Sequence, residues 1–257
     1  METMQLFGVR TRPIKPGGNL VKVILDAVNG QGLTIEDWDI LAVASKVVAT
    51  VQGRMVKLSS VKPSGRAEEL AGKYSMDPRH VELVLREAEE IFGGVSGSLL
   101  TLKDKVLIPN AGVDHKNVPE GYIILWPERP HETAEKIRQE ILEKTGKRVG
   151  VLIVDSRVTP LRMGTVGVAI GVAGFEPIRD FRTKTDLYGN PLLITRHAVA
   201  DDIASSAHLI MGEADERTPL VLIRNAPIEL KGKINPDSVI ISAKECLFMN
   251  ALARKDR

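Results

Sequence analysis

Asp155 stands where this sequence could bind a metal ion. It follows the apolar run VLIV at 151–154, and the carboxyl end of a buried strand is where α/β proteins place their ligands. Enzymes that use nucleotides often hold a metal with an aspartate at such a position. Ser156 would add a hydroxyl oxygen beside it. The alternative role for Asp155 is to cap a following helix, and the residues alone do not separate the two.

Asp114 is a second candidate ligand, in the polar segment PNAGVDHKN at 109–117. Such residues form turns, so a hydrogen-bonded loop is the simplest interpretation. In a functional site, Asp114 would offer a hard oxygen to Mg²⁺ or Mn²⁺, and Asn117 would hydrogen-bond a ligand. Arg157 and Arg162 would then neutralise phosphate oxygens, although surface ion pairs explain them equally well.

The familiar nucleotide and hydrolase motifs are absent from the sequence. It contains no P-loop, no G-x-S-x-G elbow, no protein-kinase set and no H-E-x-x-H pair, and its five histidines lack metal-ligand spacing. The segment DLYG at 186–189 indicates a turn. Glu213 lies in a polar loop at 211–218, where it would reach a metal or simply face solvent. Any use of a nucleotide must therefore depend on a less common fold.

Composition excludes several classes of protein. The chain has 35 basic and 33 acidic residues among 257, with no basic cluster, so a nucleic-acid partner is not expected. Cys246 is the single cysteine, which rules out an intrachain disulfide and a cysteine-rich zinc site. The N-terminus does not resemble a signal peptide, and no apolar run reaches about 18 residues. We therefore expect a cytoplasmic protein with no membrane partner.

Short apolar runs alternate with helical patterns, and these elements must position the candidate residues. Strands are expected at 41–51 (with a turn at Ser45-Lys46), 105–108, 122–126, 149–154 and 220–224. Helices are expected from Asp77-Pro78 to Phe92, at 131–144 before Gly146, and at 198–211 before Gly212. The glycine-rich segment at 164–174 is either a strand or backbone that lies close to a ligand. The series favours an α/β or α+β fold but not a doubly wound sheet.

Seven segments occur in an order that resembles the coenzyme F420-0:L-glutamate ligase family, the γ-glutamyl ligases of deazaflavin cofactor synthesis. They are IKPGGNL (14–20), ASKVVATVQGR (44–54), NAGVDHKN (110–117), GKRVGVLIVDS (146–156), RMGTVGVAIG (162–171), DLYG (186–189) and ADDIASSAHLIMGE (200–213). Each motif is modestly specific, whereas their ordered combination is highly specific.

The resemblance implies an α+β fold of mixed sheets and helices that forms an intertwined homodimer. Residues 1–225 would be the catalytic domain and 226–257 a C-terminal extension, packed on it or partly frayed, with its basic end, Arg254 to Arg257, frayed. The implied reaction adds L-glutamate through an amide bond to the terminal carboxylate of coenzyme F420-0. GTP is cleaved, an acyl phosphate forms, and two Mg²⁺ or Mn²⁺ ions and K⁺ assist.

The resemblance also assigns site residues. Asp114 and Asp155 match the family's catalytic, metal-binding aspartates, and Ser156 and Glu213 complete the metal set. The implied nucleotide contacts are Thr11, Arg12, Pro13, Ile14, Ser45, Lys46, Asn117, Met211 and Gly212.

Some positions depart from the family pattern. Thr50 replaces a nucleotide-contacting lysine, and Gly18-Asn19 replaces two carboxylates. The run from Ser156 to Pro160 also differs from the usual T-x-G-R. Two alternatives therefore stay open. One is a relative that glutamylates another acceptor, such as a folate or other pterin, and the other is a nucleotide- or deazaflavin-binding protein without catalysis.

Overall fold

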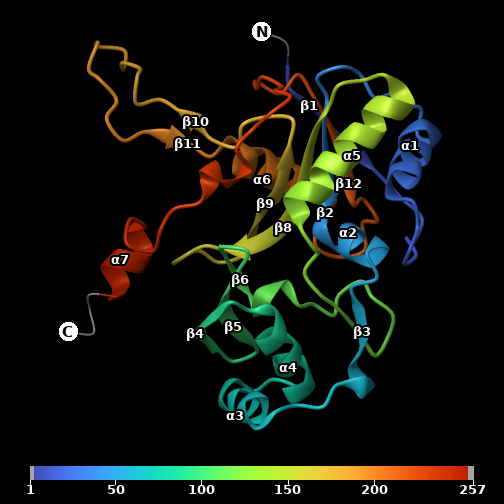
Figure 1. The fold of residues 1–257 in the computed structure, drawn as a ribbon, viewed down its shortest axis with the longest axis vertical. Coiled ribbons are helices and arrows are strands. Elements are labelled where there is room, and N and C mark those ends of the chain that lie inside the picture. The colour runs from blue at the N-terminus through green and yellow to red at the C-terminus, as the bar shows by residue number, and fades with distance from the viewer. Residues whose placement is uncertain (1–2, 254–257) are drawn as a thin grey trace.

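A five-stranded mixed sheet forms the centre of the computed structural model, which describes residues 3–253 (Figure 1). The β2–β8 pair is parallel, and the other neighbouring strands are antiparallel. This mixture confirms the expected α+β class and the absence of a doubly wound sheet. In spatial order the strands are β1 (Gln5–Val9), β12 (Leu220–Arg224), β2 (Ile40–Ala44), β8 (Gly150–Val158) and β9 (Thr165–Ala173).

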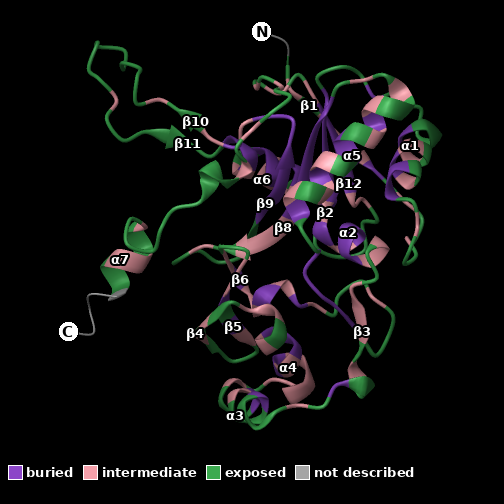
Figure 2. Ribbon diagram, viewed as in Figure 1, coloured by how far each residue is buried: buried purple, intermediate pink, exposed green. Residues whose placement is uncertain are grey.

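Helices cover both faces of this sheet, and the strands are buried between them (Figure 2). Successive side chains of β8 point to opposite faces, as the pleat requires. Val151 and Ile153 join the core beneath α1 and α5, whereas Leu152 and Val154 join the core beneath α6. The helices are α1 (Leu20–Gly30), α5 (Pro130–Thr145) and α6 (Val199–Met211).

A smaller unit is inserted between α2 (Ser45–Val51) and α5, and it lies below the main sheet in Figure 1. It has its own core, which includes Val81, Leu99 and Ile123. Its elements are β3 (Met55–Lys57), η1 (Leu58–Ser60), α3 (Gly65–Tyr74), α4 (Pro78–Glu87), β4 (Glu90–Val95), β5 (Ser98–Lys103), β6 (Val106–Pro109), η2 (Asn110–Gly112) and β7 (Tyr122–Ile124).

Several expected elements are confirmed within a residue or two. They are the helices at 131–144 and 198–211, the start of the helix at Pro78 and the strand at 220–224. Two expectations are wrong. The run at 41–51 is not one strand, because α2 begins at Ser45 and buries Val47, Val48 and Ala49. The helix that begins at Pro78 ends at Glu87, and residues 90–95 pair with β5 instead.

The glycine-rich segment at 164–174 forms β9, and its glycines allow close helix packing. A Cβ on Gly167 would lie 2.4 Å from the Ala204 carbonyl oxygen of α6. A Cβ on Gly171 would lie 2.6 Å from the Pro130 carbonyl oxygen of α5. The backbone therefore approaches two helices at these positions.

Two segments extend from the main body in Figure 1. One is an arm at 178–198, whose base is the pair β10 (Arg179–Asp180) and β11 (Arg196–His197). The other is the tail, which begins against Gly174 through the Lys231 amide and continues through η3 (Pro236–Val239) to α7 (Leu247–Ala253). The expected fraying of Arg254 to Arg257 lies outside the described residues. Within residues 3–253, no helix has the length and apolar character needed to cross a membrane.

Candidate functional site

The carboxyl ends of β2 and β8 bring predicted site residues together. The two strands run in parallel, with Ala44 opposite Val154. Because α2 begins directly after Ala44, Ser45 and Lys46 lie beside Asp155. The Ser45 hydroxyl lies near the Asp155 carboxylate and tends to lower its pKa. Asp155 itself lies within β8, so the helix-capping alternative is wrong.

Asp114 completes this group from the smaller unit. Its backbone pairs with that of Ile124, and its Oδ1 accepts hydrogen bonds from the amides of His115 and Lys116. Its Oδ2 lies 2.6 Å from Nζ of Lys46. Burial tends to raise the pKa of Asp114, but Lys46 and the two amides outweigh it and hold that pKa below its usual value. The loop interpretation is therefore correct, and the carboxylate is also paired with a cation.

Asp155 has the opposite electrostatic environment. Burial raises the pKa of its carboxyl group, and the nearby charge of Asp114 adds to that rise. The Ser45 hydroxyl, the Ser156 amide and the Lys46 charge oppose it without cancelling it. Lys46 thus acts electrostatically on two carboxylates that repel each other. Such a pair of carboxylates favours a cation between them.

Glu213 and Asn117 connect the loop at 212–218 to the Asp114 loop. Nδ2 of Asn117 donates to the Ala214 carbonyl oxygen at 2.8 Å. Oε2 of Glu213 lies 3.8 Å from Nζ of Lys116, while its Oε1 accepts from Thr165 at 2.6 Å. Burial tends to raise the pKa of Glu213, but Thr165, His208 and Lys116 together lower it. Glu213 therefore contacts Lys116, whose amide donates to Asp114.

The predicted N-terminal contact residues reach the same loop. The Thr11 amide donates to the Arg217 carbonyl oxygen at 3.1 Å. Arg12 and Pro13 are exposed, whereas Ile14 packs against the main core.

Met211 and Gly212 have local structural roles at the end of α6. The Met211 side chain is buried in the core beneath α6. Gly212 has a φ of 74°, and a Cβ there would lie 2.2 Å from the Glu216 carboxyl carbon. Neither residue therefore offers a side chain to a ligand.

Ser156 lies on a different face from Asp155. Its cross-strand partner is Gly167, which faces α6, and directly paired residues of two strands share a face. Its amide, not its hydroxyl, contacts Asp155. The structure therefore separates the Ser156 hydroxyl from the two aspartates.

Asp114 and Asp155 together suit one kind of metal ion. No group of three or more His, Cys, Asp or Glu residues converges within the described part of the chain. Mg²⁺ is usually held by one or two carboxylates together with substrate phosphates and water, rather than by a cage of protein ligands. The two carboxylates therefore fit Mg²⁺ or Mn²⁺ that arrives with a nucleotide.

Arg157 is paired elsewhere and does not contact this group. Nη2 of Arg157 lies 3.1 Å from Oδ2 of Asp201, so the hairpin of β8 and β9 is tied to α6. The ion-pair interpretation of Arg157 is thus confirmed. Oδ1 of Asp201 accepts from the Ala169 amide, whereas Asp202 contacts His197, so the side chains of these adjacent residues point in different directions.

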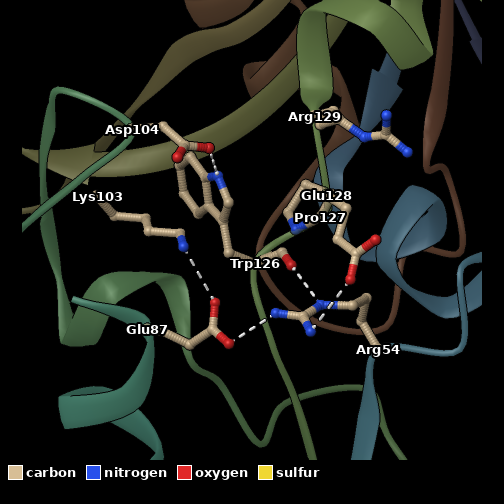
Figure 3. Close-up of a pocket in the computed structure, with 8 residues that line it drawn as sticks. All are labelled: Arg54, Glu87, Lys103, Asp104, Trp126, Pro127, Glu128 and Arg129. Carbon is tan, nitrogen blue, oxygen red and sulfur yellow. Dashed lines mark hydrogen bonds and ion pairs between the residues drawn. The ribbon is translucent and has the colours of Figure 1, made fainter. Parts of the chain in front are cut away.

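A second group of charged residues has no motif in the sequence. A cavity of about 330 Å³ lies where the smaller unit meets the start of α5 (Figure 3). Its charged side chains come from separate segments and carry no motif, so only the fold brings them together. The lining residues are Arg54, Glu87, Lys103, Asp104, Trp126, Pro127, Glu128 and Arg129.

Comparison with known proteins covers most of the chain. The family model described as F420-0:Gamma-glutamyl ligase matches residues 8–225. A protein of Methanocaldococcus jannaschii named Coenzyme F420:L-glutamate ligase is 44% identical over 217 residues, or 84% of this chain and 86% of that protein. Proteins of the same name from Methanopyrus kandleri and Archaeoglobus fulgidus are 40% and 37% identical. The alignment with the Methanopyrus protein covers 86% of both chains, and the alignment with the Archaeoglobus protein covers 98% of both.

Proposed function

This chain belongs to the F420-0:gamma-glutamyl ligase family, and we propose that it adds L-glutamate to coenzyme F420-0 with cleavage of GTP. The proposed reaction rests on family membership. The proposed site rests on a group of four residues, Ser45, Lys46, Asp114 and Asp155. It combines a cation with two carboxylates beside the carboxyl ends of the parallel strands β2 and β8, which is where ligands bind in such sheets.

The proposed reaction has two steps. The terminal carboxylate of the acceptor attacks the γ-phosphate of GTP, so an acyl phosphate forms and GDP leaves. The glutamate amine then attacks the acyl carbon, so an amide forms and inorganic phosphate leaves. Both partners of the first step are anions. Lys46, which already neutralises Asp114 at 2.6 Å, would also reduce the repulsion of the phosphates.

Asp114 and Asp155 would hold Mg²⁺ or Mn²⁺, and Glu213 would approach it from the loop at 212–218. When bound, the metal would draw negative charge from the phosphate oxygens. Asn117 and the Thr11–Ile14 loop lie around the same group and would contact the nucleotide. A second divalent ion and K⁺ complete the proposed requirements.

A mass-spectrometric assay tests the function. Purified protein is incubated with F420-0, L-glutamate, GTP, Mn²⁺ and K⁺, with single omissions as controls. The expected product is heavier by one glutamyl unit and forms only in the complete mixture. GTP binding without any such product would show a nucleotide-binding protein that lacks this catalysis.

The acceptor is tested in the same assay with a folate in place of F420-0. Thr50 and Asn19 motivate this comparison, because they depart from the family pattern. In the structure, Asn19 caps α1 by accepting from the Lys22 amide at 2.8 Å, which accounts for this residue without a change of acceptor. We therefore expect turnover with F420-0 and none with the folate.

A further inference from the structure

The cavity beneath Trp126 is lined by charges of alternating sign (Figure 3). Nζ of Lys103 lies 3.3 Å from Glu87, and Nη2 of Arg54 lies 2.7 Å from the other oxygen of Glu87. Nη1 of Arg54 lies 3.5 Å from Glu128. The side chain of Arg129 points away from this group in the figure. Lys103, Glu87, Arg54 and Glu128 therefore form one continuous chain of ion pairs.

Three of these charges are largely removed from water, whereas the Glu128 side chain is 59% exposed. The exposed fraction is 11% for the Glu87 side chain, 20% for Lys103 and 22% for Arg54. Interactions between charges strengthen as water is excluded, so a ligand that exchanges partners with these groups would be held firmly. Small-molecule sites typically span about 300–1,000 Å³. A cavity of about 330 Å³ is at the low end, which suits a free amino acid better than a nucleotide.

The signs of the lining charges limit the kinds of ligand that the cavity could bind. A phosphate or a simple carboxylate would be repelled by the carboxylates of Glu87, Asp104 and Glu128. A simple cation would be repelled by Arg54 and Lys103. A dicarboxylic amino acid has two carboxylates and one ammonium group, so it can satisfy both kinds of lining group.

Two residues that line the cavity have a left-handed backbone. Asp104, with a φ of 46°, is a central residue of the two-residue turn that joins β5 and β6, and a hairpin turn of this length calls for that conformation. Its carboxylate accepts a hydrogen bond from Nε1 of Trp126 at 2.7 Å. Arg129, with a φ of 44°, directly precedes α5 and has no such explanation, because residues other than glycine seldom adopt this conformation. The first turn of α5 begins with Pro130 and has no side-chain cap.

The cavity lies close to the proposed metal site. Ile124 pairs with Asp114 on one side and with Met55 on the other. Paired strands are about 5 Å apart, so the backbones of Asp114 and Met55 are separated by about 10 Å. Arg54 precedes Met55, and Trp126 follows Ile124 by two residues. The cavity-lining residues Arg54 and Trp126 therefore belong to the two strands nearest to the Asp114 backbone.

We propose that this cavity binds the substrate amino acid, L-glutamate, as a zwitterion. Arg54 and Lys103 bind its carboxylates, and Glu87 and Glu128 bind its ammonium group. The identity of the amino acid rests on the proposed function, whereas the preference for a dicarboxylic zwitterion rests on the lining charges.

Two substitutions test the cavity in steady-state kinetics. Lys103→Met removes one cation, and Glu87→Gln removes one carboxylate while keeping its shape. A hydrogen bond to a charged group contributes about 1.5–3 kcal/mol, so the KM for L-glutamate should rise roughly 10- to 100-fold in each variant. The kcat and the KM for GTP should stay within about twofold of wild type, because neither side chain contacts the aspartate site. Lys147→Met is the matched control, because Lys147 pairs with Asp37 outside the cavity.

Unchanged KM values for L-glutamate in both variants would overturn the cavity assignment and leave the ligase function intact. If the wild-type protein ligates no glutamate, the function fails, and calorimetric titration of the full chain decides the cavity separately. Binding of L-glutamate to wild type, with no binding to Lys103→Met and no binding of glutarate, supports the assignment. Equal affinity of wild type and Lys103→Met, or no binding at all, overturns it.

Discussion

At the residue scale, Lys46 determines how its two carboxylate neighbours behave. It lies 2.6 Å from Asp114 and holds the pKa of that group low, yet burial keeps the pKa of Asp155 high. The fold therefore stabilises the ionised form of Asp114. That contribution is present above the unfolded pKa of about 3.9 and is lost as the pH falls through the lower folded value. For Asp155 the sign is reversed, and its ionised form costs stability at neutral pH.

We expect Asp114→Asn and Asp155→Asn to act alike on catalysis and oppositely on stability. Each should lower kcat by about 10²–10³-fold or more, because each removes charge that would hold the metal. Asp114→Asn should lower the free energy of unfolding by about 1 kcal/mol through loss of the Lys46 pair. Asp155→Asn should raise it by roughly 0.5–2 kcal/mol, as at other sites where function opposes stability. Ligase assays and urea denaturation at pH 7, without metal or nucleotide, measure the two effects.

Asp26→Asn is the control for this pair, because Asp26 forms an exposed ion pair with Lys22 on α1. It should leave turnover unchanged. Normal turnover in Asp114→Asn or Asp155→Asn would place the metal site elsewhere. A loss of stability in both variants would contradict the electrostatic argument.

Residues of the candidate site differed in how far the sequence could predict them. Asp114 and Asp155 each follow an apolar run in the sequence, and the family resemblance assigns both as metal ligands, so the sequence suffices to propose them. Glu87 and Lys103 lie on an ordinary helix and an ordinary hairpin, and their 3.3 Å contact exists only because the smaller unit folds. Ser156 shows the converse, because adjacency in sequence to Asp155 placed its hydroxyl on the opposite face of β8.

At the element scale, the glycines of β9 set the distance between the sheet and its helices. Gly167→Ala should lower the free energy of unfolding by about 1–3 kcal/mol, because the added methyl would lie 2.4 Å from the Ala204 carbonyl oxygen. Gly72→Ala is the matched control within α3, where nothing lies within 4 Å of an added Cβ. It should raise stability by about 0.4–1 kcal/mol. Chemical denaturation of both variants measures the difference, and a neutral Gly167→Ala would mean that α6 is free to move.

His131, at the start of α5, should make the stability of the folded protein depend on pH. Burial lowers the pKa of His131, and the charges of Asp237 and Asp104 oppose that shift without reversing it. Its Nδ1 accepts the Val172 amide at 3.1 Å, which requires that nitrogen to be unprotonated. The unfolded chain therefore binds a proton more readily, and stability should fall as the pH drops below about 6.5.

The variant His131→Gln isolates this effect, because its amide oxygen can still accept from Val172. Urea denaturation at pH 7.5 and 5.5 should show a smaller pH-dependent loss for the variant than for wild type. The difference should not exceed about 1.4 kcal/mol per pH unit, the limit for one group. Burial also lowers the pKa of His80, so some pH dependence should remain. Identical losses in the two proteins would contradict a buried neutral His131.

Helices and strands were predictable where local pattern and burial agreed. The helix at 131–144 has an apolar face and Gly146 with a φ of 70° at its end, and it formed as expected. Local pattern failed at 45–51, where β-branched residues favour a strand but contact with the core favours α2. It failed again after Glu87, because pairing of residues 90–95 with β5 is a long-range contact that helical spacing does not reveal.

At the scale of the whole molecule, large apolar side chains are concentrated on the parts that extend from the body. Leu161 and Met163 at the tip of the β8–β9 hairpin are fully exposed, as is Leu187 in the arm at 178–198. Ile194 of the arm is 85% exposed. Large apolar side chains that protrude into solvent are typical of protein–protein interfaces. The family resemblance implies a homodimer, and these positions are candidates for its interface.

We therefore expect the protein to be a dimer in which each arm packs on the partner chain. The double substitution Leu187→Asp with Ile194→Asp should convert it largely to a monomer, because two buried charges without partners would face an apolar surface. Light scattering after size exclusion measures the change, starting from twice the 28.1 kDa chain mass. Val95→Asp is the control, since Val95 is 71% exposed on β4 of the smaller unit, and it should leave the dimer intact. A wild-type monomer at micromolar concentration, or a double variant that stays dimeric, would show that the arm has another role.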